Sequence, residues 1–128
     1  MPAWNDYKRE ARERGALALE LYVARSVPAK PPEKLREMLP SHLAYQAELE
    51  AAGKLAFAGP VSDESGEELH GEGMIIYRAE SLEAARALAE ADPMHSNGTR
   101  RYELRRWLIN EGSFTLNVGL SGKSVSFR

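Results

Sequence analysis

The chain has 128 residues, of which 43% are hydrophobic, so it is long enough for one domain with a hydrophobic core and too short for two. It contains no cysteine, which excludes disulfides, thiolate metal sites and a cysteine nucleophile. The formal net charge of −2 provides no general attraction to nucleic acids or acidic membranes. We therefore expect a single domain over residues 1–128 with no nucleic-acid partner.

No apolar run approaches the ~20 residues that cross a bilayer. The first residues, MPAWNDYKRE, lack the apolar stretch of a signal peptide. The absence of cysteine is compatible with a reducing compartment. We expect a soluble, unprocessed, cytoplasmic protein without a membrane partner.

The first part of the chain predicts an extension, a strand and a long helix. Residues 1–15 include a charged, helix-compatible run and are expected to form an N-terminal extension with a helix. An alternating run predicts the first strand over 16–26. Prolines then open a helix expected over 31–52. Pro40 lies inside this helix and predicts a kink or a break into two pieces just before His42.

The rest of the chain predicts further strands, a second helix and a terminal hairpin. The strands and the helix follow from short apolar or alternating runs and from a clear N-cap at Ser81. In chain order they are a strand over 54–61, a strand over 73–79, a helix over 81–92 and a strand over 102–110. Residues 113–128 form a C-terminal extension, whose alternating apolar residues around a turn at 119–123 predict a hairpin or arm.

This order of elements indicates a ferredoxin-like βαββαβ fold of the α+β class. Such a fold has an antiparallel sheet of four strands with both helices on one face. The other face would then be a large exposed apolar patch, and self-association through it is the natural way to cover it. We expect a homodimer or a higher homo-oligomer.

Two titratable residues fall on the apolar sides of the predicted helices. At ~100° per residue, His42 lies near the middle of an apolar stripe. Asp92 projects with the apolar side of the second helix. If both helices cover the same sheet, the imidazole and the carboxylate could meet in a sheltered pocket, as acid/base pairs commonly do. The stripe around His42 consists of Leu35, Met38, Leu39, Tyr45 and Leu49.

Structural explanations exist for both residues. The helical position of His42 by itself favours, by about two to one, a core histidine whose nitrogens are satisfied by nearby polar groups. Asp92 precedes a proline and is a ready N-cap for a short helix over 93–97. Capping and catalysis can coexist, because one carboxylate oxygen can accept from an amide while the other accepts from His42.

Three segments together resemble the YCII-related (YciI-like) family: LPSHL at 39–43, GKLAFAGP at 53–60 and AEADP at 89–93. The resemblance covers roughly residues 19–112, within a core of about 16–112. It implies a dimeric α/β barrel built from ferredoxin-like protomers, with an active-site His and Asp that map to His42 and Asp92. Some relatives are similar to lyases or dehydrohalogenases of hydroxylated ring compounds, and the wider fold includes isomerases, monooxygenases and plain ligand binders.

Four further residues are candidates for substrate binding. His95 is a second imidazole three residues after Asp92, and we give it about one chance in three of a functional role against that of a surface or pocket-rim histidine. Tyr22, Tyr45 and Trp107 are candidates for lining the same cavity, although aromatic residues at such positions most often belong to the core.

A cluster of arginines in the last strand of the core interleaves with aromatic residues, as a nucleic-acid surface does. Glu103 and the acidic balance elsewhere reduce nucleic-acid binding to about one chance in ten, since alternating arginines usually form a solvated face. One of these arginines could instead attract an anionic small substrate. The cluster is Arg100, Arg101, Arg105 and Arg106.

Two other patterns carry less weight. GLSGKS at 119–124 resembles the end of a P-loop, but the first required glycine would fall at Asn117 and no helix can follow, so we reject it. The loop over 62–72 combines acidic residues with His70 but has no fixed ligand spacing. We therefore expect no metal site.

Two functional hypotheses follow. In the first, the protein is a lyase or isomerase without a cofactor, since no metal, nucleotide or flavin motif is present. His42 is then the general acid or base for a small hydroxylated or carboxylated organic substrate, and Asp92 orients the imidazole of His42. In the second, the protein is a non-catalytic ligand-binding or accessory dimer with a structural His42–Asp92 pair. A pair open to a cavity of a few hundred Å³ favours chemistry, and a sealed pair favours structure.

Overall fold

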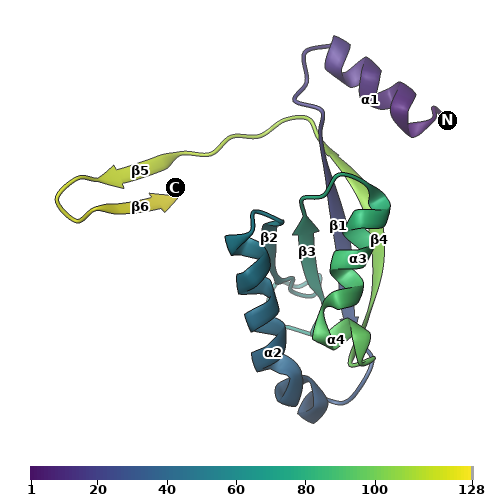
Figure 1. Cartoon of the computed structure of the whole chain (residues 1–128), viewed down its shortest axis with the longest axis vertical. Coiled ribbons are helices and arrows are strands. Elements are labelled where there is room, and N and C mark those ends of the chain that lie inside the picture. Colours follow the sequence, from purple (N-terminus) through teal and green to yellow (C-terminus); the bar gives the residue numbers. More distant parts are fainter. Residues whose placement is uncertain (128) are drawn as a thin grey trace. The chain divides into compact units, whose positions relative to one another are not determined.

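The computed structural model describes residues 1–127, which form two compact units. One unit is Glu20–Trp107, and the other combines Met1–Leu19 with the residues from Leu108 onward. Among the described residues, no helix combines the length and apolar character that a membrane span requires. In chain order (Figure 1) the elements are α1 Trp4–Glu13, β1 Leu19–Pro28, α2 Pro32–Ala51, β2 Leu55–Pro60, β3 Gly73–Tyr77, α3 Leu82–Ala91, α4 Pro93–Ser96, β4 Arg100–Ile109, β5 Leu116–Gly119 and β6 Ser124–Phe127.

The larger unit has the predicted α+β fold. Its sheet has four strands in the order β2-β3-β1-β4, and β3 pairs antiparallel with both of its neighbours. With α2 between β1 and β2 and α3 between β3 and β4, the connectivity is βαββαβ. The ferredoxin-like prediction is confirmed.

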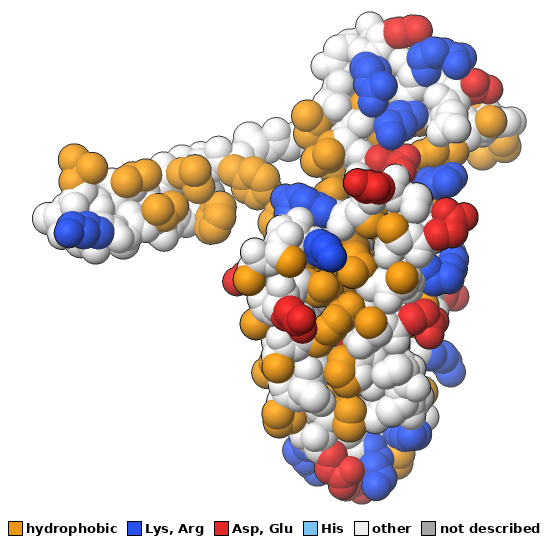
Figure 2. Space-filling model, viewed as in Figure 1, with side chains coloured by type: hydrophobic (Ala, Val, Ile, Leu, Met, Phe, Trp, Pro, Cys, Tyr) orange, Lys and Arg blue, Asp and Glu red, His pale blue; other side chains and the backbone are white. Residues whose placement is uncertain are grey.

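One face of the sheet forms the core beneath the helices. Side chains alternate along a strand, and Tyr22 of β1 lies opposite Tyr77 of β3 in the register, with Ser26 opposite Gly73. The core residues come from β1, β3, α2 and α3, so both long helices pack on the same face. Figure 2 shows hydrophobic side chains gathered between these helices. The core cluster is Tyr22, Ala24, Leu49, Ile75, Tyr77, Ala85 and Ala89.

Helix α2 is continuous through Pro40, so the predicted break into two pieces is wrong. Pro40 lies on the exposed side of the helix, where water can bind the carbonyl that the missing proline amide leaves without a donor. The Ser41 hydroxyl donates to the Met38 carbonyl at 3.1 Å in the same turn. An exposed proline is therefore accommodated within the helix.

The predicted apolar stripe of α2 is present but shallow. Leu49 is buried, whereas Leu35, Met38, His42 and Tyr45 are half-buried. Leu39 is 44% exposed, which shows that the first half of the helix does not sit directly on the core.

The boundaries of other elements differ from the predicted ones by a few residues. β1 begins at Leu19, directly after Ala18, whose positive φ of 50° interrupts extended geometry. β4 begins at Arg100, two residues earlier than expected. Helix α3 ends at Ala91, so Asp92 lies outside the helix and has an extended conformation, with ψ of 123°.

The smaller unit contains the two terminal extensions. The predicted N-terminal helix is α1, and the predicted C-terminal hairpin is formed by β5 and β6, in which Val118 lies opposite Val125. The rings of Phe114 and Phe127 contact edge to face, with centroids 6.1 Å apart. All four of these apolar side chains are exposed in the hairpin.

The close approach of α3 to the sheet depends on small residues. Ala85 is fully buried, whereas Ala87 on the same helix is exposed. We predict that Ala85→Leu lowers the free energy of unfolding by about 1–3 kcal/mol, because the added methyl groups overfill the core. Urea unfolding of Ala85→Leu and of the control Ala87→Leu measures this effect. Equal stability of the two variants would contradict the packing described here.

Candidate functional site

His42 and Asp92 meet between α2 and α4. The Nδ1 atom of His42 lies 2.9 Å from Oδ1 and 2.8 Å from Oδ2 of Asp92. The carboxylate is almost fully buried, with 1% of its side chain exposed, whereas 14% of the imidazole is exposed. The predicted convergence of these two side chains in a sheltered position is therefore observed.

Asp92 also caps α4, as its place before Pro93 predicts. Its Oδ1 accepts from the Met94 amide at 3.0 Å and is also the hydrogen-bond acceptor for His42. Capping and the contact with His42 coexist, as the sequence allows, but Oδ1 takes both hydrogen bonds. Oδ2 is close to the imidazole but has no hydrogen bond of good geometry. Because Asp92 is extended between two helices, one oxygen faces both donors.

The charge of Asp92 acts on two neighbouring phenols. The Tyr45 hydroxyl donates to the Leu88 carbonyl at 2.6 Å, and the Tyr77 hydroxyl is buried without a partner. Burial first, and then the negative charge of Asp92, raise the pKa of both Tyr45 and Tyr77. Both phenols therefore stay protonated beside the carboxylate.

The contact with Asp92 determines where neutral His42 holds its proton. A carboxylate oxygen can only accept, so Nδ1 carries the hydrogen and Nε2 carries the lone pair. The imidazole is 14% exposed, and no described residue forms a hydrogen bond with its Nε2. His42 is thus arranged to receive a proton at Nε2.

His42 lines an open cavity of about 890 Å³ on the helix side of β2 and β3. Its wall is largely apolar and includes the exposed Leu39, Leu43 and Leu69. A volume of this size accommodates a small organic ring. The polar residues of the lining are Ser26, Arg36, His42, Gln46, Glu72 and Arg100.

His95 is buried in α4, with 8% of its surface exposed, and is not a surface residue. Its Nδ1 lies 2.8 Å from the Ala89 carbonyl, and its Nε2 lies 2.8 Å from the Ser26 hydroxyl oxygen. Its ring packs against that of Tyr102, with centroids 4.6 Å apart. The lining of the cavity includes Ser26 but not His95.

The partners of His95 determine its tautomer. The Ala89 carbonyl can only accept, so Nδ1 donates and Nε2 accepts from the Ser26 hydroxyl. Burial is the largest effect and lowers the pKa of His95. The hydrogen bond to the Ala89 carbonyl and the charge of Asp92 raise this pKa, and the charges of His42 and Arg100 lower it further. His95 is therefore neutral near pH 7.

Arg100 completes this network. Its Nε donates to the Ser26 hydroxyl oxygen at 2.8 Å, and its Nη2 donates to the Ser26 carbonyl at 2.8 Å and to the Gly71 carbonyl. Burial lowers the pKa of Arg100, but the group remains far from neutralisation. The sequence did not single out Arg100 from the other arginines. The alternation of side chains along β4 could have identified it, since Arg100 shares a face of the strand with Tyr102 and Leu104, which pack against the core.

The three aromatic candidates lie elsewhere. Tyr22 is a core residue whose hydroxyl donates to Glu20, and burial first, then this contact, raise its pKa to about 12. Tyr45 packs at the edge of the core, and Trp107 is 43% exposed on β4. The lining of the 890 Å³ cavity includes none of the three.

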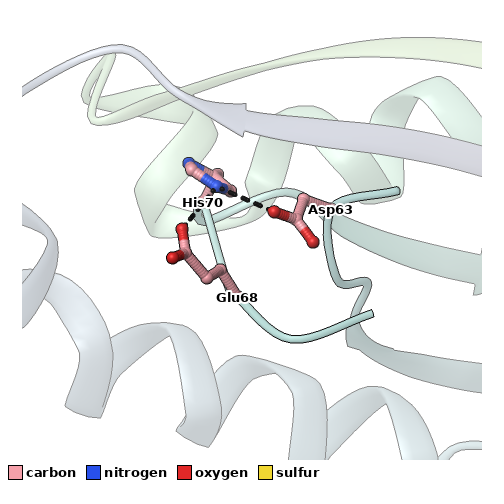
Figure 3. Close-up of side chains that lie close together, drawn as sticks. All are labelled: Asp63, Glu68 and His70. Atoms are coloured by element: carbon pink, nitrogen blue, oxygen red, sulfur yellow. Dashed lines mark ion pairs between the residues drawn. The ribbon is translucent and has the colours of Figure 1, made fainter. Parts of the chain in front are cut away.

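A second cluster of titratable groups lies in the loop between β2 and β3 (Figure 3). His70 Nε2 lies 3.4 Å from Asp63 Oδ2 and 3.3 Å from Glu68 Oε2. These three side chains offer potential metal ligands within 4.8 Å of one another. The Ser65 hydroxyl donates to Asp63 at 2.6 Å and is the main cause of the lowered pKa of that carboxyl. Because His70 and Glu68 are exposed and pair with each other, we interpret the cluster as a loop-stabilising contact.

The buried neutral His95 makes stability depend on pH. Unfolded His95 has the ordinary pKa of 6.5, whereas the folded pKa is lower, so the unfolded state binds more protons in acid. The free energy of unfolding should therefore fall as the pH drops below about 6.5. Urea unfolding between about pH 5 and pH 8 measures this, with a shallower dependence expected for His95→Asn. A pH dependence in His95→Asn equal to that of the wild-type protein would contradict the assignment.

Comparisons with known proteins agree with this architecture. The family model for the YCII-related domain matches residues 2–108, a match that includes α1 as well as the larger unit. An uncharacterized protein of Bacillus subtilis (strain 168), YjpA, is 28% identical over 76 residues, which are 59% of this chain and 82% of that protein.

A solved structure shares the fold. The 5-chloro-2-hydroxyhydroquinone dehydrochlorinase TftG from Burkholderia phenoliruptrix AC1100, in complex with 2,5-dihydroxybenzoquinone, superimposes with a TM-score of 0.54 at 23% identity. The match covers 70% of this chain and 93% of that one. The resemblance expected from the segments around His42, Gly53 and Asp92 is thereby confirmed. Since the family model spans most of its length, the chain belongs to the family of YCII-related domain proteins.

Proposed function

We propose that this protein is a small-molecule enzyme of the lyase or isomerase type in which His42 is the general base and acid. The observation that carries the proposal is the placement of one imidazole. Its Nδ1 is held by a buried carboxylate, while Nε2 has no hydrogen bond to any described residue and the residue lines a cavity of about 890 Å³. A group that moves protons needs such a free nitrogen within reach of substrate.

Asp92 has two roles in this proposal. It fixes the tautomer of His42 by accepting from Nδ1, and its negative charge stabilises the imidazolium that forms when Nε2 takes a proton. The cap contact with Met94 holds the carboxylate in place during this cycle. Asp92 is therefore a positioning residue, and His42 is the catalytic one.

The proposed reaction begins with transfer of a proton from a carbon or hydroxyl of the substrate to Nε2 of His42. The electron pair of the broken bond forms a new double bond. In an elimination, a leaving group departs from the adjacent position with its own bonding electrons, and His42 gives the proton on Nε2 to that group or to water. In an isomerisation, the proton returns from Nε2 to a different atom of the same molecule. Both routes regenerate neutral His42.

The substrate class we propose is a small hydroxylated or carboxylated organic ring. The volume of the cavity suits such a molecule. The structurally similar dehydrochlorinase acts on a hydroxylated, chlorinated ring and is seen with 2,5-dihydroxybenzoquinone. The shared fold makes compounds of this kind the first substrates to test.

We also propose that the protein is a homodimer joined through the open face of the sheet. This face carries the exposed Phe57 and Met74 together with Arg25, and it forms a shallow groove along β1, β3 and β4. Pairing two such faces would remove the apolar side chains from water and produce the dimeric barrel expected for the family. Sedimentation analysis of the purified protein tests this assembly.

The alternative function, a non-catalytic ligand-binding module, would use the same cavity with His42 as a structural residue. The partial exposure of the His42 imidazole favours the catalytic function, since a purely structural histidine–aspartate pair would be fully buried. Ligand binding without turnover by the wild-type protein would select the alternative.

We predict that His42→Asn lowers kcat/KM by at least about 100-fold, because the asparagine amide can donate to Asp92 but cannot accept and return a proton. The measurement is chloride release from 5-chloro-2-hydroxyhydroquinone, with circular dichroism and sedimentation to establish that fold and assembly persist. Wild-type turnover by His42→Asn contradicts the mechanism.

The substitution Asp92→Asn removes the negative charge of the side chain but keeps its ability to cap α4. Asparagine is a good N-cap, so α4 should remain intact, while loss of the negative charge should lower kcat on the order of a hundredfold. The matched variant Asp92→Ala also loses the cap and should unfold about 1 kcal/mol more easily than Asp92→Asn. Chloride-release kinetics and urea unfolding measure the two effects. Unchanged kcat in Asp92→Asn would remove Asp92 from the mechanism.

A further inference from the structure

Arg100 is a half-buried cation with no carboxylate partner in the described part of the chain. Its hydrogen bonds go to one hydroxyl oxygen and two backbone carbonyls, all uncharged. The same side chain lines the cavity that contains His42. Burial lowers the pKa of Arg100 and the charge of Asp92 opposes this effect, but the Asp92 carboxylate bonds to His42 and the Met94 amide and not to the guanidinium. A half-buried cation without a directly bonded counter-ion is costly, so such a group marks a place where an anion would bind.

The fold carries the Arg100 side chain across the sheet. Arg100 starts on the edge strand β4, and its guanidinium bonds to Ser26 on the neighbouring strand β1. Ser26 pairs with Gly73 of β3, and a Cβ built on Gly73 would lie 3.9 Å from Nη2 of Arg100. This distance is an ordinary van der Waals contact, which places the guanidinium directly above β3 at Gly73.

The carbonyl of Gly71 anchors the far end of the guanidinium. Gly71 has a positive φ of 86°, and a Cβ there would lie 2.5 Å from Cγ of Pro28. No other residue type fits this backbone conformation and this space without a shift. The loop thus requires glycine at the position whose carbonyl accepts from Nη2.

The hydrogen-bond inventory of Arg100 leaves two donors for a ligand. A guanidinium has five N–H groups. The contacts to Ser26 and Gly71 use the Nε hydrogen and those of Nη2, and no described residue accepts a hydrogen bond from Nη1. Nη1 can therefore donate to a group in the cavity.

The remaining charges of the cavity lining reinforce this preference. Arg36 contributes a second cation, and Glu72 is the one carboxylate among the described lining residues. Glu72 already pairs with the Arg25 guanidinium. The charged side chains that line the cavity therefore carry a net positive charge.

We infer that Arg100 binds an anionic oxygen of the ligand, a phenolate, enolate or carboxylate, and that Ser26 and His95 are the positioning residues that hold its guanidinium for this purpose. The inference rests on the proposed function only in placing the ligand in the cavity of His42. When a base removes a proton from a hydroxylated ring, negative charge develops on oxygen, and a preorganised cation stabilises that charge. Arg100 would then determine specificity for acidic substrates.

The test uses two ring compounds of similar shape and different charge. 2,5-Dihydroxybenzoquinone is acidic and anionic at neutral pH, whereas 2,5-dimethoxybenzoquinone is neutral. We expect calorimetric titration of the wild-type protein to show tighter binding of the anion. Arg100→Gln should weaken anion binding on the order of ten- to a hundredfold and leave binding of the neutral compound nearly unchanged.

Arg12→Gln is the control. Arg12 is an exposed residue of α1 and does not line the cavity. It removes the same charge from the protein without changing the cavity, so its anion preference should equal that of the wild type. Arg100→Lys keeps the charge but loses the fork geometry and should recover part of the preference.

The positioning role of Ser26 has its own readout. Ser26→Ala should lower the ratio of anion to neutral affinity, because Arg100 loses the hydroxyl that holds its Nε. A merely structural role would lower both affinities equally. An equal loss for both ligands would overturn the assignment of Ser26.

Failure of the inference is distinguishable from failure of the proposed function. His42→Asn should retain the anion preference although it has lost turnover. A wild-type protein without preference for the anion, or an Arg100→Gln protein that retains it, overturns the inference. Anion preference in a wild-type protein that releases no chloride from the chlorinated ring supports the inference and counts against the enzyme.

Discussion

Burial of the Asp92 carboxylate is the constraint on which the candidate site depends. An unpaired charge in a protein interior costs several kcal/mol, so a carboxylate with 1% of its side chain exposed needs donors. The Met94 amide and the His42 imidazole supply them. One donor comes from the helix that Asp92 begins, and the other comes from α2. The same contact therefore fixes the packing of α2 against α4 and the tautomer of His42.

The second polar network extends this organisation into the sheet. His95 lies one turn after Asp92 and receives a hydrogen bond from Ser26, which in turn accepts from Arg100. Each group has a single compatible role: the Ala89 carbonyl accepts, neutral His95 donates and accepts, and Arg100 donates. The His42 imidazole and the Arg100 guanidinium thereby reach one cavity from opposite layers of the fold, the helices and the sheet. The proposed chemistry needs both, since proton removal leaves negative charge behind.

Much of the fold and part of the site could be predicted from the chain alone. Hydrophobic periodicity and proline and glycine positions indicated the βαββαβ order, the terminal helix and the hairpin. The position of Asp92 before Pro93 predicted its cap. The predicted break of the helix at Pro40 was wrong, because local helix propensity does not indicate which side of the helix is exposed to solvent. Arg100 was not distinguished from the neighbouring arginines for two reasons. A shift of one residue along a strand moves a side chain to the other face of the sheet, and β4 begins two residues earlier than expected.

What the sequence determined by itself are the features that local chemistry controls: the class of fold, the cap at Asp92, the absence of thiol chemistry and the inward aim of His42. Tertiary structure decided what depends on residues far apart in the chain. It brought Ser26, Gly71, His95 and Arg100 into one network, gave both donors of Asp92 to a single oxygen, and left Tyr22, Tyr45 and Trp107 away from the cavity. The physical reason is that hydrogen-bond geometry between strands and helices follows from packing and register, which local patterns in the chain do not specify.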